Sequence, residues 1–260
     1  MSTFSGILEE MTIEQIMAFA PNVVALPLGS TEPHGPALPY GTDTFTIRAI
    51  AEQATRLANR GGGRVLCYPT LPITLNNNFR AWPFACRMGV RTFMAMLVDI
   101  LKQAYADGVR RACIINGHGG STDAIRAAMR DMAGMDDVPF VCLVNGWAMA
   151  DDEAQRRIVE NRSGHGGDAE ASLQMHLHPD LVHTDKLAIN PENEPKLAAL
   201  CDPKVYFVRP WHRFVPASAG GDQREASADK GRALVESAAQ GAARLLLELS
   251  QSPPSENFPY

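Results

Sequence analysis

One glycine- and proline-rich stretch, residues 29–43, holds the residue types that bind transition metals. Glu32 and His34 are two positions apart, so in an extended segment their side chains point to the same side. Asp43 can return toward them because the glycines and prolines between interrupt regular structure. Carboxylate with imidazole suits zinc, manganese or iron. The stretch follows the apolar run 23–28, and α/β proteins place their chemistry in loops after strands.

Two more glycine-rich clusters add imidazoles and carboxylates. His118 lies within Asn-Gly-His-Gly-Gly at 116–120, at the end of a second strand-like run. His165, Asp168 and Glu170 lie within 164–170, immediately before a helical pattern. The clusters together provide five candidate metal ligands, which are Glu32, His34, Asp43, His118 and Glu170.

These motifs resemble those of the creatininase (creatinine amidohydrolase) family of metal-dependent amide hydrolases. The matching segments follow the family's order and lie at 29–36 with 41–43, at 116–120, at 165–170 and at 221–232. The resemblance extends from about Asn22 to about Leu246, which is nearly the whole chain. A single motif of this kind is weak evidence, whereas three ligand-bearing motifs in order are specific.

The resemblance implies two divalent metal ions that share one carboxylate. By this pattern Asp43 bridges the ions, Glu32 and His118 hold one of them, and His34 helps to hold the other. Zinc, manganese and iron all suit such a mixed nitrogen and oxygen ligand set.

The chain departs from the family pattern at Gly120. In creatininase itself, a glutamate at this place, two residues after the histidine of the second motif, completes the second metal site. Three alternatives follow: Glu170 replaces that carboxylate, the site holds one metal, or its second ion is loose. The departure also argues against creatinine as substrate and favours the Asn-Gly-His-Gly-Gly branch of the family, whose members act on several amides.

Each candidate ligand also has a structural interpretation. Asp43 fits an N-cap of the helix expected at 44–59. Glu170 lies in the first turn of a helix, where the dipole favours a carboxylate in any case. His118 alone fits a hydrogen-bonded core histidine, but its Asn-Gly and Gly-Gly neighbours favour a ligand.

His165 is the predicted proton shuttle, because an amide nitrogen must be protonated before it leaves. The family pattern also places a catalytic histidine here, and the flanking glycines let the backbone approach a ligand closely. Asp168 is a weaker catalytic candidate, either as shuttle or as the group that orients His165.

Substrate contacts are predicted at four positions, which are Trp147, Arg80, Trp82 and Gly119. The family resemblance places a substrate-covering tryptophan near Trp147. Arg80, together with Arg87, offers a planar fork for a substrate carboxylate. The alternative is that both arginines are solvated loop charges and that Trp82 only packs.

Composition limits the classes of protein. The chain has 260 residues, 45% hydrophobic and 20% charged, which suits one globular α/β domain. A net charge of −5 gives no general attraction for nucleic acid or anionic membranes. Five cysteines without a Cys-x-x-Cys pair, and an N-terminus unlike a signal peptide, favour a cytoplasmic protein.

Strand-like and helical patterns alternate along the chain. The strand-like runs are 23–28, 65–68, 112–116 and 140–145, and the helical patterns are 44–59, 91–106, 121–132, 171–177 and 224–250. This alternation predicts one three-layer α/β/α domain over residues 1–260 with a mostly parallel central sheet. An irregular tail is expected at 251–260, and the family resemblance implies a homo-oligomer, often a hexamer.

The leading functional hypothesis is a metal-dependent hydrolase of a non-peptide C–N bond in a small cyclic amide, amide or formamide. Cleavage of a short or modified peptide by the same site is the first alternative. A metal-containing binding protein without turnover is the second.

Overall fold

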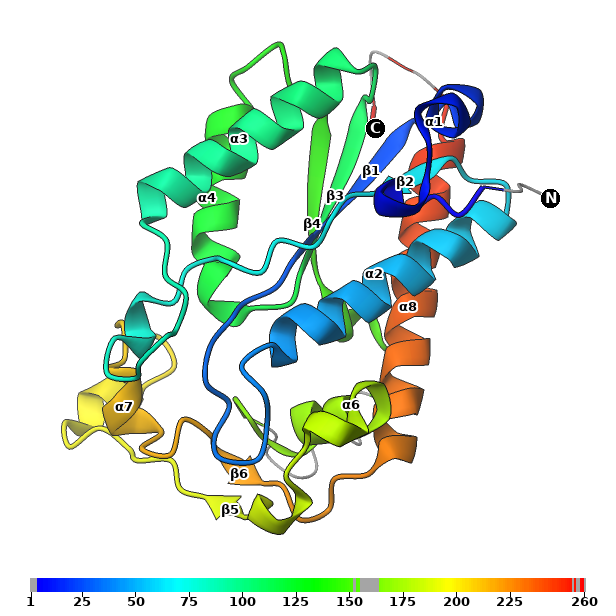
Figure 1. Ribbon diagram of the computed structural model, residues 1–260. Coiled ribbons are helices and arrows are strands. Elements are labelled where there is room, and N and C mark those ends of the chain that lie inside the picture. The colour runs from blue at the N-terminus through cyan, green and yellow to red at the C-terminus, as the bar shows by residue number, and fades with distance from the viewer. Residues whose placement is uncertain (1–3, 152, 155–163, 254, 256–257, 260) are drawn as a thin grey trace.

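The computed structural model describes residues 4–151, 153–154, 164–253, 255 and 258–259. A four-stranded parallel sheet lies at its centre, with the strand order β2-β1-β3-β4 (Figure 1). The strands are β1 (Val23–Leu28), β2 (Val65–Cys67), β3 (Arg111–Asn116) and β4 (Phe140–Asn145). A separate antiparallel pair is formed by β5 (Ile189–Asn190) and β6 (Gly221–Asp222).

Helices cover both faces of the central sheet, as Figure 1 shows. One face carries α3 (Val90–Ala106) and α4 (Thr122–Met132), and the other carries α2 (Thr42–Arg60) and α8 (Ala228–Gln251). Beside α2 and α8 lies α6 (Asp168–Leu177), and two short helices are α1 (Ile13–Phe19) and α7 (Trp211–Phe214). The predicted three-layer α/β fold with a parallel sheet is confirmed.

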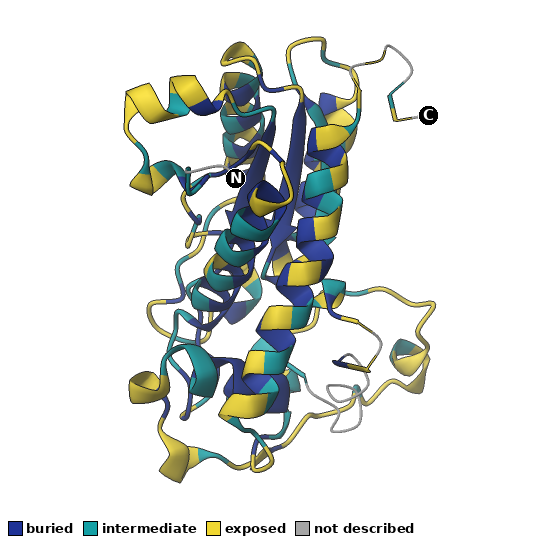
Figure 2. Ribbon diagram, turned by 90° about the vertical axis from the view of Figure 1, so that its right-hand side faces the viewer, coloured by how far each residue is buried: buried dark blue, intermediate teal, exposed yellow. Residues whose placement is uncertain are grey.

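The sequence of β1 explains why both faces need a helical layer. Val23 and Ala25 pack toward α2 and α8, whereas Val24 and Leu26 pack toward α3 and α4. Successive strand residues point to opposite faces, so an unbroken apolar run is stable only between two layers. Every residue of β1 and of its neighbour β3 is buried, and Figure 2 shows the central sheet in the colour of buried residues.

Helix α3 shows how a polar exterior and an apolar interior are combined. Phe93, Leu97 and Leu101 recur every four residues and are fully buried against the sheet. Each such side chain contributes about 1.5–3 kcal/mol by leaving water. The span of α3, Val90–Ala106, is close to the residues 91–106 that this periodicity predicts.

Three predicted helix starts shift in the structure, and α6 begins at Asp168, three residues before its predicted start. Helix α2 begins at Thr42, and its N-cap is Gly41, so Asp43 is inside the first turn and is not the cap. Helix α8 begins at Ala228, not near residue 224, because the Ser227 hydroxyl caps it by accepting from the Lys230 amide. The carboxylate of Asp43 is thereby left available for other contacts.

The C-terminal tail packs back onto the sheet in its described part. The Arg111 guanidinium donates to the Pro253 carbonyl at 3.0 Å and lies 4.7 Å from the Phe258 ring centroid. The Phe258 ring also meets Phe140 edge-on at 4.9 Å. These contacts lie at the amino ends of β3 and β4, at the opposite edge of the sheet from the loops that follow the strands.

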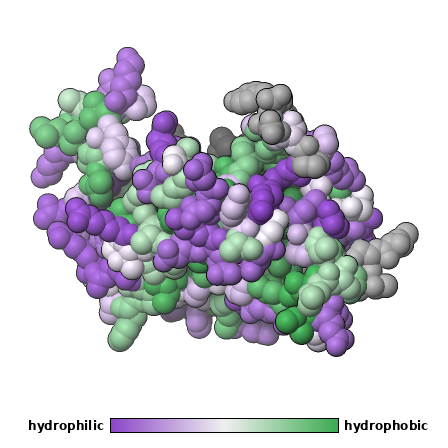
Figure 3. All heavy atoms as spheres, turned by 90° about the horizontal axis from the view of Figure 1, so that it is seen from above, coloured by the Kyte–Doolittle hydropathy of each residue, from purple (hydrophilic) through white to green (hydrophobic). Residues whose placement is uncertain are grey.

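Figure 3 views the molecule from above, from the end at which the strands of the central sheet begin. Hydrophilic side chains cover much of this surface, between smaller apolar patches. Within the described part of the chain, no helix combines the length and apolar character needed to span a bilayer.

Candidate active site

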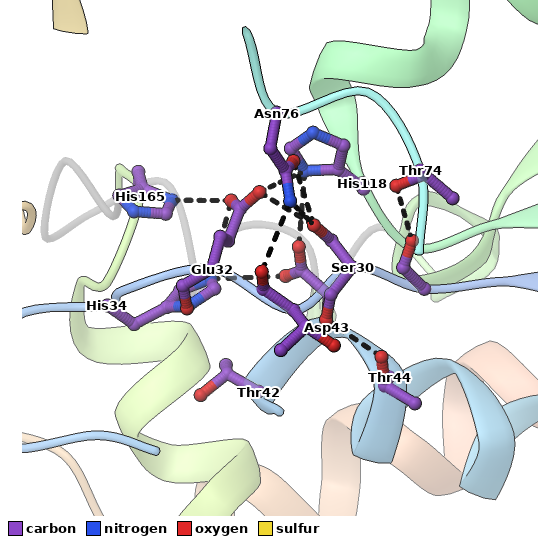
Figure 4. A network of polar contacts seen from close by, with 12 residues as sticks. Ser30, Glu32, His34, Thr42, Asp43, Thr44, Thr74, Asn76, His118 and His165 are labelled. Carbon is purple, nitrogen blue, oxygen red and sulfur yellow. Dashed lines mark hydrogen bonds and ion pairs between the residues drawn. The ribbon is translucent and has the colours of Figure 1, made fainter. Parts of the chain in front are cut away.

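The candidate ligands meet at the carboxyl edge of the sheet. Strands β1 and β3 are parallel neighbours in register, with Leu28 opposite Asn116. The loop after β1 carries Glu32 and His34, and the loop after β3 carries His118. Because the carboxyl ends of adjacent parallel strands lie side by side, the two loops converge at one place (Figure 4).

Two polar residues that belong to no predicted site fix the first loop. The Ser30 hydroxyl donates to Glu32 Oε2 at 2.7 Å and accepts from Asn76 Nδ2 at 2.7 Å. Thr44 in α2 donates its hydroxyl to the Ser30 carbonyl at 2.8 Å. Ser30 and Asn76 are fully buried, so this network holds the Glu32 carboxylate in one orientation.

The first group of converging side chains is Glu32, Asp43 and His118. His118 Nδ1 lies 3.2 Å from Glu32 Oε2 and 3.2 Å from Asp43 Oδ2. The opposite ring nitrogen, Nε2, donates to the Leu75 carbonyl at 3.0 Å. This hydrogen bond leaves Nδ1 unprotonated in the neutral ring and directed at the carboxylates, as a metal-binding imidazole requires.

The second group is His34, Asp43 and Glu170. His34 Nε2 lies 3.2 Å from Asp43 Oδ1 and 3.6 Å from Glu170 Oε2. Its Nδ1 donates to the main-chain carbonyl of Glu32 at 3.0 Å. Asp43 therefore directs one oxygen to each group, and Glu170 brings a third carboxylate to the cluster, whereas Gly120 has no side chain.

The electrostatics of the cluster fit a divalent cation. Burial alone would lower the pKa of His34, but the charges of Asp43 and Glu170 outweigh it and raise that pKa to about 10. Burial would likewise lower the pKa of His118, but the neighbouring Glu32 charge outweighs it, and that pKa rises well above its ordinary value. Burial opposes ionisation of Asp43, but the neighbouring His34 charge holds the pKa of Asp43 below its usual range.

The surroundings of the Asp43 carboxylate also fit a bound cation. Its Oδ2 atom is buried and accepts no hydrogen bond from the described residues. A buried carboxylate oxygen without a donor is costly unless a cation satisfies it. The members of both groups also offer ligand atoms within 4.8 Å of one another. The donor set, with three carboxylates and two oriented imidazoles, therefore suits one or two zinc, manganese or iron ions.

Gly120 has a packing reason to lack a side chain. A Cβ atom there would lie 2.4 Å from His118 Nε2 and 3.1 Å from the Leu75 carbonyl oxygen. These two atoms form the hydrogen bond that orients His118. The His118 ring thus occupies the space that a side chain at position 120 would need.

Substitution of Gly120 should weaken metal binding. Gly120→Ala is expected to displace the His118 ring and to lower metal affinity about 10- to 100-fold. Gly119→Ala is the matched control, because a Cβ there meets no heavy atom within 4 Å. Titration against a chelating dye measures both affinities. Equal affinities of the two variants would contradict this role of Gly120.

His165 lies beside the cluster on the loop before α6. Its Nε2 donates to the Pro33 carbonyl at 2.9 Å, and its Nδ1 lies 3.6 Å from Glu32 Oε1. The ring packs 4.3 Å from the His34 ring centroid. Burial, and then the charge of His34, lower the pKa of His165 to about 3, so its imidazole is neutral in this environment.

Glu170 is tied to the same loop. Its Oε2 accepts from the Gly166 amide at 2.6 Å, and burial raises the pKa of Glu170 to about 7. The Gly220 amide donates to the His165 carbonyl at 2.7 Å, and the Gln223 side chain donates to the Gly166 carbonyl. Gln223 is fully buried and is a further positioning residue that the sequence did not reveal.

Asp168 does not join the cluster. Its carboxylate is directed to Lys230 of α8, with Oδ2 3.2 Å from Lys230 Nζ, and it lines a separate cavity between α6 and α8. Lys230 Nζ also donates to the Glu225 carbonyl at 2.6 Å. The expectation that Asp168 moves a proton or orients His165 is therefore not supported by its position, which ties the start of α6 to α8.

Loss of this ion pair should affect stability more than turnover. Asp168→Asn is expected to lower the free energy of unfolding by about 1–3 kcal/mol, less than for a fully buried pair because Lys230 is partly exposed. The rate constant kcat should change less than about tenfold, in contrast to loss of a proton shuttle. Denaturant unfolding and steady-state kinetics measure both effects. Asp222→Asn, which breaks the exposed pair with Arg224, should change neither, and a large fall in kcat for Asp168→Asn would restore its catalytic role.

A cavity of about 1000 Å³ opens onto the cluster. Trp147, on the 3₁₀ turn Gly146–Met149 after β4, and Gly119 both line it, and their contact with a substrate stays a prediction. Arg80 is exposed, Arg87 is exposed, and Trp82 is half-buried, and none of these three lines the cavity. The loop around residues 77–88 turns their side chains elsewhere, so their predicted contact with substrate is not supported.

Two further aromatic side chains, which the sequence does not predict at the site, line this cavity. Phe79 lies 5.1 Å from the His165 ring centroid and 5.7 Å from Trp211, and Trp211 lies 5.6 Å from His165. Phe79 comes from the loop before α3, and Trp211 from α7. No local sequence signal connects these distant segments.

A parallel α/β sheet with buried carboxylates and oriented histidines at its carboxyl edge suits a metal-dependent hydrolase. The family model described as "Creatininase: Creatinine amidohydrolase" matches residues 9–246. The chain therefore belongs to the creatininase family, as the motifs predicted, and it is a metal-dependent amidohydrolase.

Individual relatives support this membership at modest identity. Creatinine amidohydrolase of Pseudomonas putida is 28% identical over 271 residues, covering 98% of this chain and 99% of the relative. A mycofactocin precursor peptide peptidase of Mycobacterium ulcerans (strain Agy99) is 28% identical over 194 residues, covering 70% of this chain and 69% of the relative.

Solved structures agree with the fold. A Bacteroides fragilis NCTC 9343 structure that carries a creatinine amidohydrolase designation has a TM-score of 0.85 at 27% identity, covering 96% of this chain and 98% of its own. A structure named "Creatininase Mn" has a TM-score of 0.75 at 26% identity, and a mutant creatininase of "Zn-Zn type" has 0.75 at 25%. Both cover 96% of this chain and 100% of their own.

Proposed function

We propose that this protein hydrolyses a C–N bond of an amide in a small molecule, with two divalent metal ions held by the five converging ligands. Asp43 carries the proposal, because its two oxygens lie 3.2 Å from ligand atoms of both histidine groups. One ion is assigned to Glu32, Asp43 and His118, and the other to His34, Asp43 and Glu170. Bound ions of this kind supply hydroxide near neutral pH and polarise a carbonyl.

His165 is assigned the proton transfer to the leaving nitrogen. Its Nε2 hydrogen is held by the Pro33 carbonyl, so Nδ1 is the atom that accepts and then delivers the proton. Nδ1 also faces the cavity side of the cluster, 3.6 Å from Glu32 Oε1. A neutral imidazole at this place can accept a proton from water and pass it to the amide nitrogen.

The aromatic walls are assigned to substrate packing. Trp147, Phe79 and Trp211 line the cavity around His165, where they exclude water from the reacting carbonyl. Apolar walls with a few convergent polar groups are typical of small-molecule sites.

The cavity volume also supports the alternative of a short or modified peptide. About 1000 Å³ lies at the upper end of the size that small-molecule pockets have. The relative from Mycobacterium ulcerans is named as a peptide peptidase. A non-peptide cyclic amide or formamide and a short peptide are therefore both candidate substrates of the same chemistry.

Quaternary structure and location are further parts of the proposal. Ile13 and Met17 on α1 are each 75% exposed and lie one helical turn apart, which supports a contact with another copy in a homo-oligomer, by family resemblance a hexamer. All five cysteines are free thiols, which is consistent with a cytoplasmic protein. Light scattering after gel filtration tests the oligomer, and a monomeric mass would contradict it.

Metal removal tests the proposed function. Protein treated with a chelator and dialysed should hydrolyse none of a panel of lactams, formamides and short peptides, and added Zn²⁺ or Mn²⁺ should restore turnover. Calcium, which prefers oxygen-only sites, is the control ion and should not restore it. Turnover that survives complete metal removal would contradict the proposal.

A further inference from the structure

One basic side chain lies on the wall of the active-site cavity. Among the described residues that line it, Arg209 is the only arginine or lysine. It belongs to the segment 205–209, whose five consecutive residues all face the cavity. This segment precedes α7, which carries Trp211. We propose that Arg209 binds a carboxylate of the substrate, so that the favoured substrates are amides that carry a free carboxylate.

The guanidinium of Arg209 is positioned by aromatic rings. Its central carbon lies 4.3 Å from the Phe214 ring centroid and 5.9 Å from the Phe207 ring centroid. Stacking of this kind fixes the plane of the guanidinium and leaves its edge N–H groups available for a planar acceptor. Arg209 is thus oriented by packing and not by a carboxylate partner of its own.

No ion pair between described residues involves Arg209. The described acidic side chains on the same cavity are Glu32, Asp43, Asp123 and Glu170, and none of them lies within ion-pair distance of the guanidinium. Arg209 is exposed at the mouth of the cavity, and its guanidinium, without an ion-pair partner among the described residues, is available to an anionic group of the ligand.

Ring contacts connect Arg209 to the reacting centre. Phe214 lies 5.3 Å from Trp211, and Trp211 lies 5.6 Å from His165. A substrate with its amide beside His165 can therefore extend along Trp211 and reach Arg209 with a carboxylate. The arginines at 80 and 87 have no such connection, because they lie outside the cavity lining.

This inference rests on the proposed function for the amide part of the substrate, but its test does not require turnover. The probes are N-benzoyl-6-aminohexanoate and its neutral carboxamide, which differ only in the charged group and have a chain long enough to extend along Trp211. Manganese-loaded protein is titrated with each probe, and the fluorescence of Trp147 and Trp211, which line the cavity, reports binding. A second pair, tetra-alanine with a free and with an amidated C-terminus, shows whether the carboxylate comes from a small amide or from a peptide end.

Wild type should bind the carboxylate of at least one pair about 10- to 100-fold more tightly than its neutral partner, the range expected for charge-assisted hydrogen bonds. Arg209→Gln should abolish this preference, and Arg209→Lys, which keeps the charge but loses the fork, should retain part of it. Arg213→Gln is the matched control, since Arg213 lies four residues on, is exposed and does not line the cavity.

Three results would overturn the inference: equal binding of charged and neutral probes by wild type, no measurable binding of either carboxylate at millimolar concentration, or an unchanged preference in Arg209→Gln. Circular dichroism confirms that each variant is folded, and Arg209→Lys serves as the test if Arg209→Gln is not. A carboxylate preference without hydrolysis of any amide would leave this inference intact and contradict the proposed function. Hydrolysis of an amide without a carboxylate preference would support the proposed function and contradict this inference.

Discussion

Asp43→Asn is expected to abolish amide hydrolysis and to remove both metal ions. Asp43 directs Oδ1 to the His34 group and Oδ2 to the His118 group, so one substitution alters both proposed sites. The amide nitrogen of asparagine is a donor that repels a cation, and it would replace one of two buried acceptor oxygens. We expect kcat/KM to fall at least about 1,000-fold, more than the 10- to 100-fold typical of residues that only orient ligands.

Steady-state kinetics with elemental analysis of the same preparation checks this result. Asp123→Asn is the matched control, because Asp123 lines the same cavity on the first turn of α4 but belongs to neither ligand group. Its metal content should equal that of wild type. An Asp43→Asn enzyme that keeps two ions per subunit would contradict the bridging role.

His165→Ala is expected to lower kcat by about 100- to 10,000-fold, the usual range for loss of a general acid or base. The metal content should stay the same, because the proposed ligand groups are complete without His165. His176→Ala is the control, since His176 lies on α6 outside the cavity lining. Pre-steady-state kinetics separates the chemical step from product release.

Metal content decides between two roles of His165. Its ring also offers a ligand atom within 4.8 Å of those of Glu32 and His34. If His165→Ala loses an ion together with its activity, His165 is a ligand and not a proton shuttle. Rescue of kcat by added imidazole, with metal content unchanged, would support the shuttle.

The layers of the fold could be predicted from the sequence because burial imposes them. The run Val23–Leu28 is apolar at every position, which a strand tolerates only between two helical layers. The strand order could not be predicted, since it depends on which loops cross over the sheet. Helix α8 begins at Ala228 because the Ser227 side chain caps it, whereas α2 begins at Thr42 after Gly41, which makes no side-chain cap.

The candidate ligands were predictable because glycine-rich motifs after strands carry them. Glu32, His34, Asp43 and His118 converge as their spacing and order indicated. The role of Glu170 had been left open, and the structure places its carboxylate 3.6 Å from His34 Nε2. The position of α6 brings Glu170 close to His34, and the spacing of these residues along the chain does not predict this contact.

Residues whose position depends on tertiary packing were not predictable. Asp168 is two residues from Glu170, but the helix turns its carboxylate toward Lys230 of α8. Arg80 looked like a carboxylate fork, yet the arginine on the cavity wall is Arg209, from a loop with no recognisable motif. Distant segments converge here, so their roles emerge only in three dimensions.

Glu170 is proposed to complete a second metal site that shares Asp43 with the first. The most direct test is metal content per subunit by elemental analysis, for wild type and for Glu170→Gln loaded with the same ion. Glutamine keeps the size of the side chain, so the loop before α6 should keep its conformation, but it removes the negative charge that the second ion needs. Two ions per subunit are expected in wild type and one in Glu170→Gln. One ion in both proteins, or none in wild type after loading, would contradict it.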